Sequence, residues 1–191
     1  MKIIIETIPH DQQRYPTCGD WYFKAIAEDG SEIDLHPEAP IRTLINAGKI
    51  VLYIKVSKVS DWKHSALVAV HELAEVMLCI NDGVSQEEVD KFDFDYEENR
   101  AEGDESEPGD SIQAPYRTQH CFATAIERML CAAFGLSWLE YENEISALFE
   151  SPAEKPAEAP PGGWPPTVQP LVPEVGGCPP PPVEPGPPEA A

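Results

Sequence analysis

The chain has 191 residues, of which 34 are acidic and 13 are lysine or arginine, and its formal net charge is −21. This acidity argues against a protein that binds nucleic-acid phosphates or an anionic membrane surface, because such surfaces need clustered lysine and arginine. Five widely spaced cysteines without a CxxC pair suit a reducing cytoplasm, so we expect a cytoplasmic protein with no nucleic-acid or membrane partner.

The carboxyl end differs in composition from the rest of the chain. Residues 151–191 hold 15 of the 21 prolines and show almost no periodic apolar pattern. Proline fixes φ and removes a backbone donor, and too little apolar surface is present to offset the entropy of ordering. We therefore expect a single α+β domain over residues 1–150, followed by a disordered proline-rich tail over 151–191.

The amino-terminal third carries the strand signals. Residues 2–8 are β-branched, residues 20–27 are rich in aromatic side chains, and residues 32–35 can return as the second arm of a hairpin. Residues 41–47 form a short helix that ends at a glycine, and residues 50–56 are the strongest strand of the chain. These elements predict a small, mainly antiparallel sheet.

About four longer helices follow the sheet. The first starts near residue 60 and ends near residue 80, and Ser85 with Glu88 forms a capping box before the second. Acidic residues dominate after it, which predicts a mobile acidic loop over 97–113. The remaining helices are expected over 86–96, 118–134 and 137–149.

Side-chain patterns assign faces to two of these helices. Asp90, Asp93 and Asp95 are expected on a solvated face, because no EF-hand spacing accompanies them. In the helix over 118–134, a core face is expected from the apolar side chains Phe122, Ile126, Met129, Leu130 and Phe134.

Three polar residues lie in the middle of an otherwise apolar helix. His71, Glu72 and Glu75 fall within an arc of roughly 100°, and apolar residues such as Val68 and Leu78 lie one turn away on either side. The three side chains are therefore expected in or beside the core, where ionised carboxylates need compensation. Either a metal ion or a buried histidine–glutamate network would supply it.

The spacing of these residues resembles the His-Glu-x-x-His helix of zincin metallohydrolases, with Glu75 in place of the second histidine. The resemblance implies that His71 and Glu75 bind a divalent metal, most simply zinc, and that Glu72 activates the metal-bound water. His120 is expected as a third ligand, and Glu127 as a further ligand or as the residue that orients His120. Residues 52–56 resemble the zincin edge strand, which could hold an extended peptide.

A second resemblance covers most of the first 150 residues. The chain is similar to an uncharacterised protein family of tailed bacteriophages and prophages, which implies a protein of the bacterial host cytoplasm and no particular reaction. The matching segments are 1–23, 55–79, 84–93, 108–110 and 114–116, together with His120 and Glu127.

Three functions remain open from the sequence. The first is a phage-encoded metal-dependent hydrolase, with peptide bonds as the expected substrate. The second is a non-enzymatic acidic protein that binds or inhibits a host protein through its acidic loop. The third is a magnesium-dependent nucleotide pyrophosphohydrolase-like enzyme that uses Glu72, Glu75 and acids of the helix over 86–96. The scarcity of basic phosphate-binding residues counts against this third function.

Overall fold

The computed structural model describes residues 1–36, 39–101, 104 and 106–150, so the expected tail over 151–191 lies outside the described residues. No helix in these ranges combines the length and the apolarity needed to cross a membrane. The chain order of the elements is β1 (Lys2–Ile8), η1 (His10–Gln12), β2 (Gly19–Ile26), β3 (Glu32–Asp34), α1 (Ile41–Asn46), β4 (Ile50–Ser57), α2 (Trp62–Asp82), α3 (Gln86–Glu98), η2 (Pro108–Asp110), α4 (Arg117–Ala133) and α5 (Trp138–Glu150).

The four strands form one mixed sheet in the order β1-β4-β2-β3. The expected antiparallel pairing holds for β2 with β3 and for β2 with β4, whereas β1 is parallel to β4. A parallel pair needs a long connection, which the hairpin and α1 supply between β1 and β4. The expectation that residues 52–56 form an edge strand is wrong, because β4 lies between β1 and β2. Its apolar side chains explain the interior position: Leu52 and Ile54 have no exposed surface.

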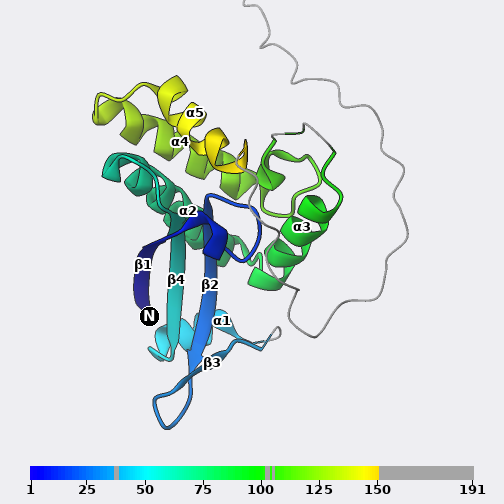
Figure 1. The fold of residues 1–191 in the computed structure, drawn as a ribbon. Coiled ribbons are helices and arrows are strands. Elements are labelled where there is room, and N and C mark those ends of the chain that lie inside the picture. Colours follow the sequence, from blue (N-terminus) through cyan, green and yellow to red (C-terminus); the bar gives the residue numbers. More distant parts are fainter. Residues whose placement is uncertain (37–38, 102–103, 105, 151–191) are drawn as a thin grey trace, which may run out of the picture. The chain divides into compact units, whose positions relative to one another are not determined.

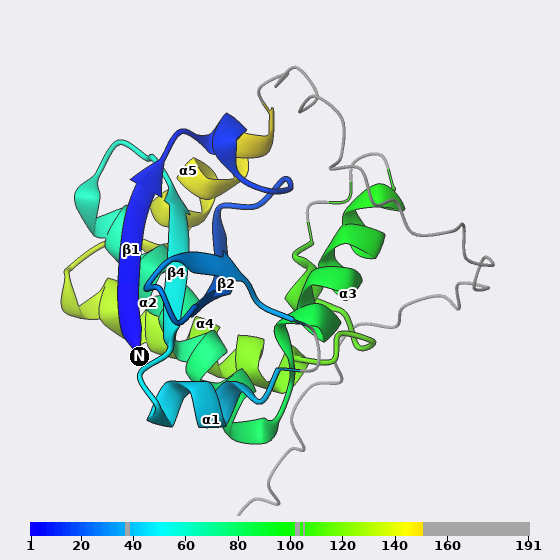
Figure 2. The same ribbon diagram turned by 90° about the horizontal axis from the view of Figure 1, so that it is seen from below.

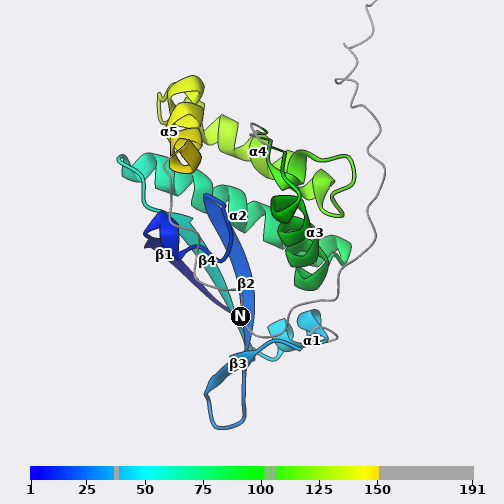
Figure 3. The same ribbon diagram turned by 45° about the vertical axis from the view of Figure 1, so that its right-hand side comes forward.

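Helix α2 lies across one face of the sheet, and α4 packs on the opposite side of α2 (Figure 1; Figure 3). This middle position explains why α2 is apolar on nearly every side. The helix begins after Asp61, whose side chain accepts a hydrogen bond from the Lys63 amide, and it ends at Gly83, which has a φ of 84°. The core between α2 and the sheet contains Trp21, Phe23, Leu52, Ile54, Leu67, Val68 and Val76.

Helix α4 turns a polar face toward α2, contrary to the expected core face. Phe122, Ile126 and Met129 are 59%, 41% and 73% exposed, whereas His120 and Glu127 are buried. The polar side chains face inward because α2 offers them polar partners at the same level. Phe122, Ile126 and Met129 therefore lie on the outer surface of the helix, whereas Leu130 and Phe134 of the expected core face are partly buried against the core.

Helix α3 lies beyond the β2 side of the sheet (Figure 2). Its expected capping box is present, with the Ser85 hydroxyl accepting from the Glu88 amide and the Glu88 carboxylate accepting from the Ser85 amide. The solvated position expected for Asp93 is wrong, since this residue is only 4% exposed. Its carboxylate accepts hydrogen bonds from the hydroxyls of Tyr15 and Tyr116, which compensate its burial.

Candidate metal centre

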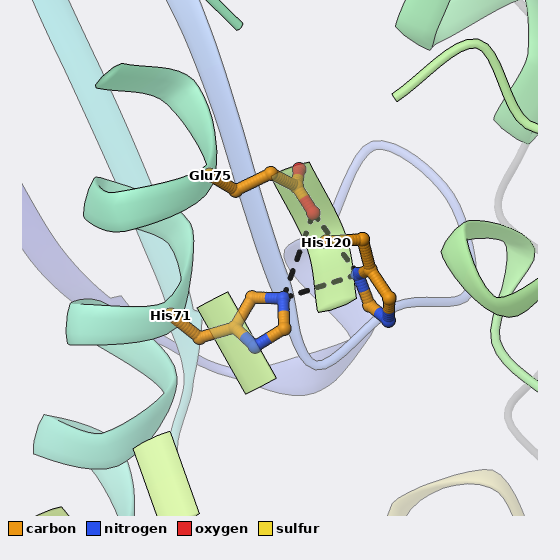
Figure 4. Close-up of side chains that lie close together, drawn as sticks. All are labelled: His71, Glu75 and His120. Carbon is orange, nitrogen blue, oxygen red and sulfur yellow. Dashed lines mark hydrogen bonds and ion pairs between the residues drawn. The ribbon is translucent and has the colours of Figure 1, made fainter. Parts of the chain in front are cut away.

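Three side chains from two helices converge on one point. His71 and Glu75 lie one turn apart on α2, and His120 lies in the first turn of α4 (Figure 4). His120 Nδ1 is 3.0 Å from Glu75 Oε2 and 3.2 Å from His71 Nε2, and His71 Nε2 is 3.5 Å from Glu75 Oε2. All three residues are buried. The sequence expectation that these residues share a site therefore agrees with their positions.

The site depends on a close backbone approach next to His120. Gly109, in η2, is buried, and a Cβ built on it would lie 2.3 Å from Cγ and 2.5 Å from Nδ1 of His120. Real Cβ atoms do not tolerate such contacts, so only glycine leaves room for the imidazole ring at this position. The segment that carries Gly109 thus helps to fix the ring of His120.

The nitrogen of His71 that faces away from the centre is held by a carboxylate. Its Nδ1 lies 3.0 Å from Glu127 Oε2, and the other oxygen of Glu127 accepts a hydrogen bond from the Tyr141 hydroxyl of α5. A histidine whose far nitrogen donates to a carboxylate has a fixed ring orientation and a fixed tautomer, an arrangement common around protein-bound metals. The sequence suggested that Glu127 is a ligand or orients His120. In the structure Glu127 orients His71 instead.

The other two side chains are held in the same way. Trp21, on β2, donates its indole N–H to Glu75 Oε1 at 3.0 Å, which leaves Oε2 directed at the centre. His120 Nε2 lies 3.2 Å from Glu107 Oε2 and 3.8 Å from Asp110 Oδ1, both near η2. Each of the three converging residues thus has its far atom engaged by a different partner.

These far contacts determine what faces the centre. A carboxylate cannot donate, so Glu127 fixes a proton on Nδ1 of His71, and Glu107 fixes one on Nε2 of His120. In neutral rings the two nitrogens that face each other then carry lone pairs, and Glu75 Oε2 adds a third acceptor. Two arrangements relieve these contacts: a second proton on each ring, which places donors at the centre, or one cation bound between the three atoms.

The spacing of the three atoms fits a transition-metal ion. A point about 1.9 Å from each atom is the centre of the triangle that they form, and zinc bonds to histidine nitrogen and carboxylate oxygen are about 2.0–2.2 Å long. In the described part of the chain, no further histidine, cysteine, aspartate or glutamate belongs to this group. Two histidines and one glutamate with a free fourth position are typical of catalytic zinc rather than of closed structural sites.

The electrostatics of the site favour positive charge on the rings. Burial lowers the pKa of His120, but its contacts with Glu107 and Glu75 outweigh burial and raise the pKa to about 10. Burial also lowers the pKa of His71, and contacts with Glu127 and Glu75 raise it well above its usual value. Burial raises the pKa of Glu75, yet the two histidines bring it down to about 2.

Glu72 lies next to the centre but not among the three converging residues. Its carboxylate packs against β2, where a Cβ built on Gly19 would lie 2.3 Å from Glu72 Oε1. Burial, followed by the charge of Glu75, raises the pKa of Glu72 well above its usual value, while His71 opposes the shift. A buried carboxyl group with a raised pKa beside a metal site is suited to accept and release protons.

Sequence reasoning missed three partners of the side chains in and around the centre. Trp21, Glu107 and Tyr141 had no signal, because each reaches the centre from a separate element. His64 of α2 is also buried, and its imidazole contacts Glu144 of α5. Among the acids of α3, Asp93 is buried and its carboxylate is engaged by Tyr15 and Tyr116.

Comparisons with family models, with curated proteins and with solved structures gave no match for this chain.

Proposed function

We propose that the protein is a metal-dependent hydrolase with a zincin-like centre, in which His71, Glu75 and His120 bind one divalent ion, zinc in the simplest case. The observation that carries this proposal is the convergence of three acceptor atoms, 3.0–3.5 Å apart, whose far sides are all engaged. Without a metal, a second proton on each ring would place donors between these atoms, and the raised pKa values of His71 and His120 correspond to that state. In the proposed centre one divalent ion replaces those inner protons, while Glu127 and Glu107 keep the outer ones.

The remaining residues have separate roles in the proposed reaction. A zinc ion held by His71, Glu75 and His120 would supply a water molecule of lowered pKa. Glu72 would serve as the general base for that water in peptide-bond hydrolysis and as the general acid for the leaving amine. Glu127 and Tyr141 hold His71 in place, so the geometry is set before substrate arrives.

Metal content tests the binding step. The full chain, purified without a histidine tag, should hold about one zinc per protein, measured by mass spectrometry of the metal after dialysis. His120→Ala should lose that zinc, whereas His36→Ala, a change at an exposed histidine outside the centre, should keep it. A metal-free wild-type chain whose thermal stability is unchanged by added zinc or by chelator would show that the centre is a buried hydrogen-bond network.

Turnover tests the reaction separately from binding. Zinc-loaded protein should release peptides from fluorescently labelled casein, and a chelator should stop the release. Glu72→Gln keeps the size and burial of the side chain but removes its basicity, so it should retain zinc and lose activity. If Glu72→Gln is as active as the wild type, the assigned role of Glu72 is wrong even though the metal site stands.

A further inference from the structure

The sheet has an open edge at β1. This strand has one strand neighbour among the described residues, β4, and lies at the margin of the sheet in both views (Figure 1; Figure 2). Its register with β4 is continuous from Lys2 to Ile8, without a bulge, and it contains no proline. Natural edge strands are usually interrupted by such features, because a regular edge can pair with another strand. The outer side of β1 is therefore suited to further pairing.

An apolar groove runs beside this edge, on the face of the sheet that α2 covers. It has a volume of about 520 Å³, and its lining includes Ile5 and Thr7 of β1 with Val59 and Trp62. Ile3 and Ile5 are 42% and 50% exposed, and Trp62 is 69% exposed. Exposed apolar side chains along a regular sheet edge are typical of a protein–protein interaction surface.

The charged residues of β1 indicate that a second copy of the same strand can pair with it. In an antiparallel pair of two β1 strands centred on Ile4, Lys2 of each copy lies opposite Glu6 of the other, and Ile3 lies opposite Ile5. Centring the pair on Ile3 or on Ile5 instead places a charged residue opposite an isoleucine. Opposite charges and apolar pairs stabilise cross-strand contacts, so only the register centred on Ile4 is self-complementary.

We propose that two copies of this chain pair through antiparallel β1 strands centred on Ile4, which joins their sheets into one of eight strands. The Ile3 side chain of each copy then enters the groove beside Ile5 of the other copy. Lys2 of the second copy joins the ion pair that Glu6 already makes with Lys55. Such a contact is isologous, since the same residues serve on both sides of a two-fold axis.

Charge reversal at Lys2 and Glu6 distinguishes pairing between two copies from a role of these residues within one copy. Lys2→Glu places two glutamate pairs across the axis, and Glu6→Lys places two lysine pairs there. Each variant alone should dissociate roughly tenfold more readily than the wild type, since each change affects two symmetric pairs. Mixed in equal amounts, the two variants should form a heterodimer of wild-type stability, because every facing pair is again of opposite sign.

Sedimentation velocity over a range of concentrations measures these equilibria, with any purification tag at the carboxyl end. Lys91→Glu makes the same change in charge on exposed α3 and should leave the dimer intact. Circular dichroism confirms that each variant is folded. A wild-type chain that stays monomeric at about 100 μM overturns the proposal, as does a dimer that neither charge variant weakens or that mixing fails to restore.

Discussion

The substitution Gly109→Ala should strongly weaken metal binding without removing any ligand. Gly109 does not occupy the left-handed region of φ, so alanine fits the backbone, and the added methyl group acts on the site alone. Its Cβ would lie 2.5 Å from His120 Nδ1, the atom directed at the centre. Relief of that contact requires the ring to move by about 1 Å, whereas metal–ligand distances tolerate about 0.2 Å. We therefore expect zinc affinity to fall by about 100-fold or more.

The expected loss corresponds to about 2.7 kcal/mol of binding free energy, which competition against a fluorescent chelator can resolve. Zinc should raise the melting temperature of the wild type and fail to do so for Gly109→Ala, because the stabilisation depends on affinity. Gly19→Ala is the matched control, since its Cβ would displace Glu72 and the core residue Val68 but no proposed ligand. It should retain zinc and lose turnover.

Two outcomes would refute this reasoning. Wild-type zinc affinity in Gly109→Ala would mean that His120 Nδ1 is not a ligand. Equal loss of zinc in Gly19→Ala would mean that both glycines act through the general stability of the fold, which the melting temperatures of the metal-free proteins would show independently.

Three further predictions concern the surroundings of the centre and the core. Trp21→Phe and Tyr141→Phe each remove a hydrogen bond to Glu75 or to Glu127, so each should lower zinc affinity by about 10- to 100-fold in the same competition assay, without complete loss. Burial raises the pKa of Asp93 to about 7 in the folded protein. The protonated side chain therefore stabilises the fold at low pH, and this stabilisation is lost as pH rises through about 7. Urea unfolding at pH 5 and pH 8 should therefore show a drop of about 3 kcal/mol that Asp93→Asn lacks. Ile54→Ala leaves a cavity at a fully buried side chain of β4, so the free energy of unfolding measured in urea should fall by about 2–5 kcal/mol. The zinc stoichiometry should stay unchanged.

The part of the site that could be predicted is the part that one helix defines. Residues four positions apart on a helix point the same way, so His71 and Glu75 were expected together, and the apolar residues around them indicated burial. The partnership with His120 followed from a second helix with the same unusual composition. Local geometry is fixed by the sequence of one element, which is why His71 and Glu75 lie where they are expected relative to each other.

The contacts that hold the ligands could not be predicted, because each depends on tertiary packing. Trp21 comes from a strand and Tyr141 from the last helix, and nothing in either segment points to Glu75 or Glu127. Glu107 was expected only as part of an acidic loop. Hydrogen bonds of this kind depend on where elements meet, and a single sequence does not contain that information.

The reversed orientation of α4 follows from the site itself. Hydrophobic periodicity placed Phe122 and Met129 in the core, on the rule that apolar residues lie inside. Three buried polar side chains on α2 cannot pack against isoleucine or phenylalanine without leaving acceptors unpaired, a cost of about 1–3 kcal/mol each. Turning His120 and Glu127 inward gives Glu75 and His71 polar partners, while Phe122 and Met129 lie exposed. Where a helix builds part of a site, its polar residues are therefore a better guide to its inner face than its apolar ones.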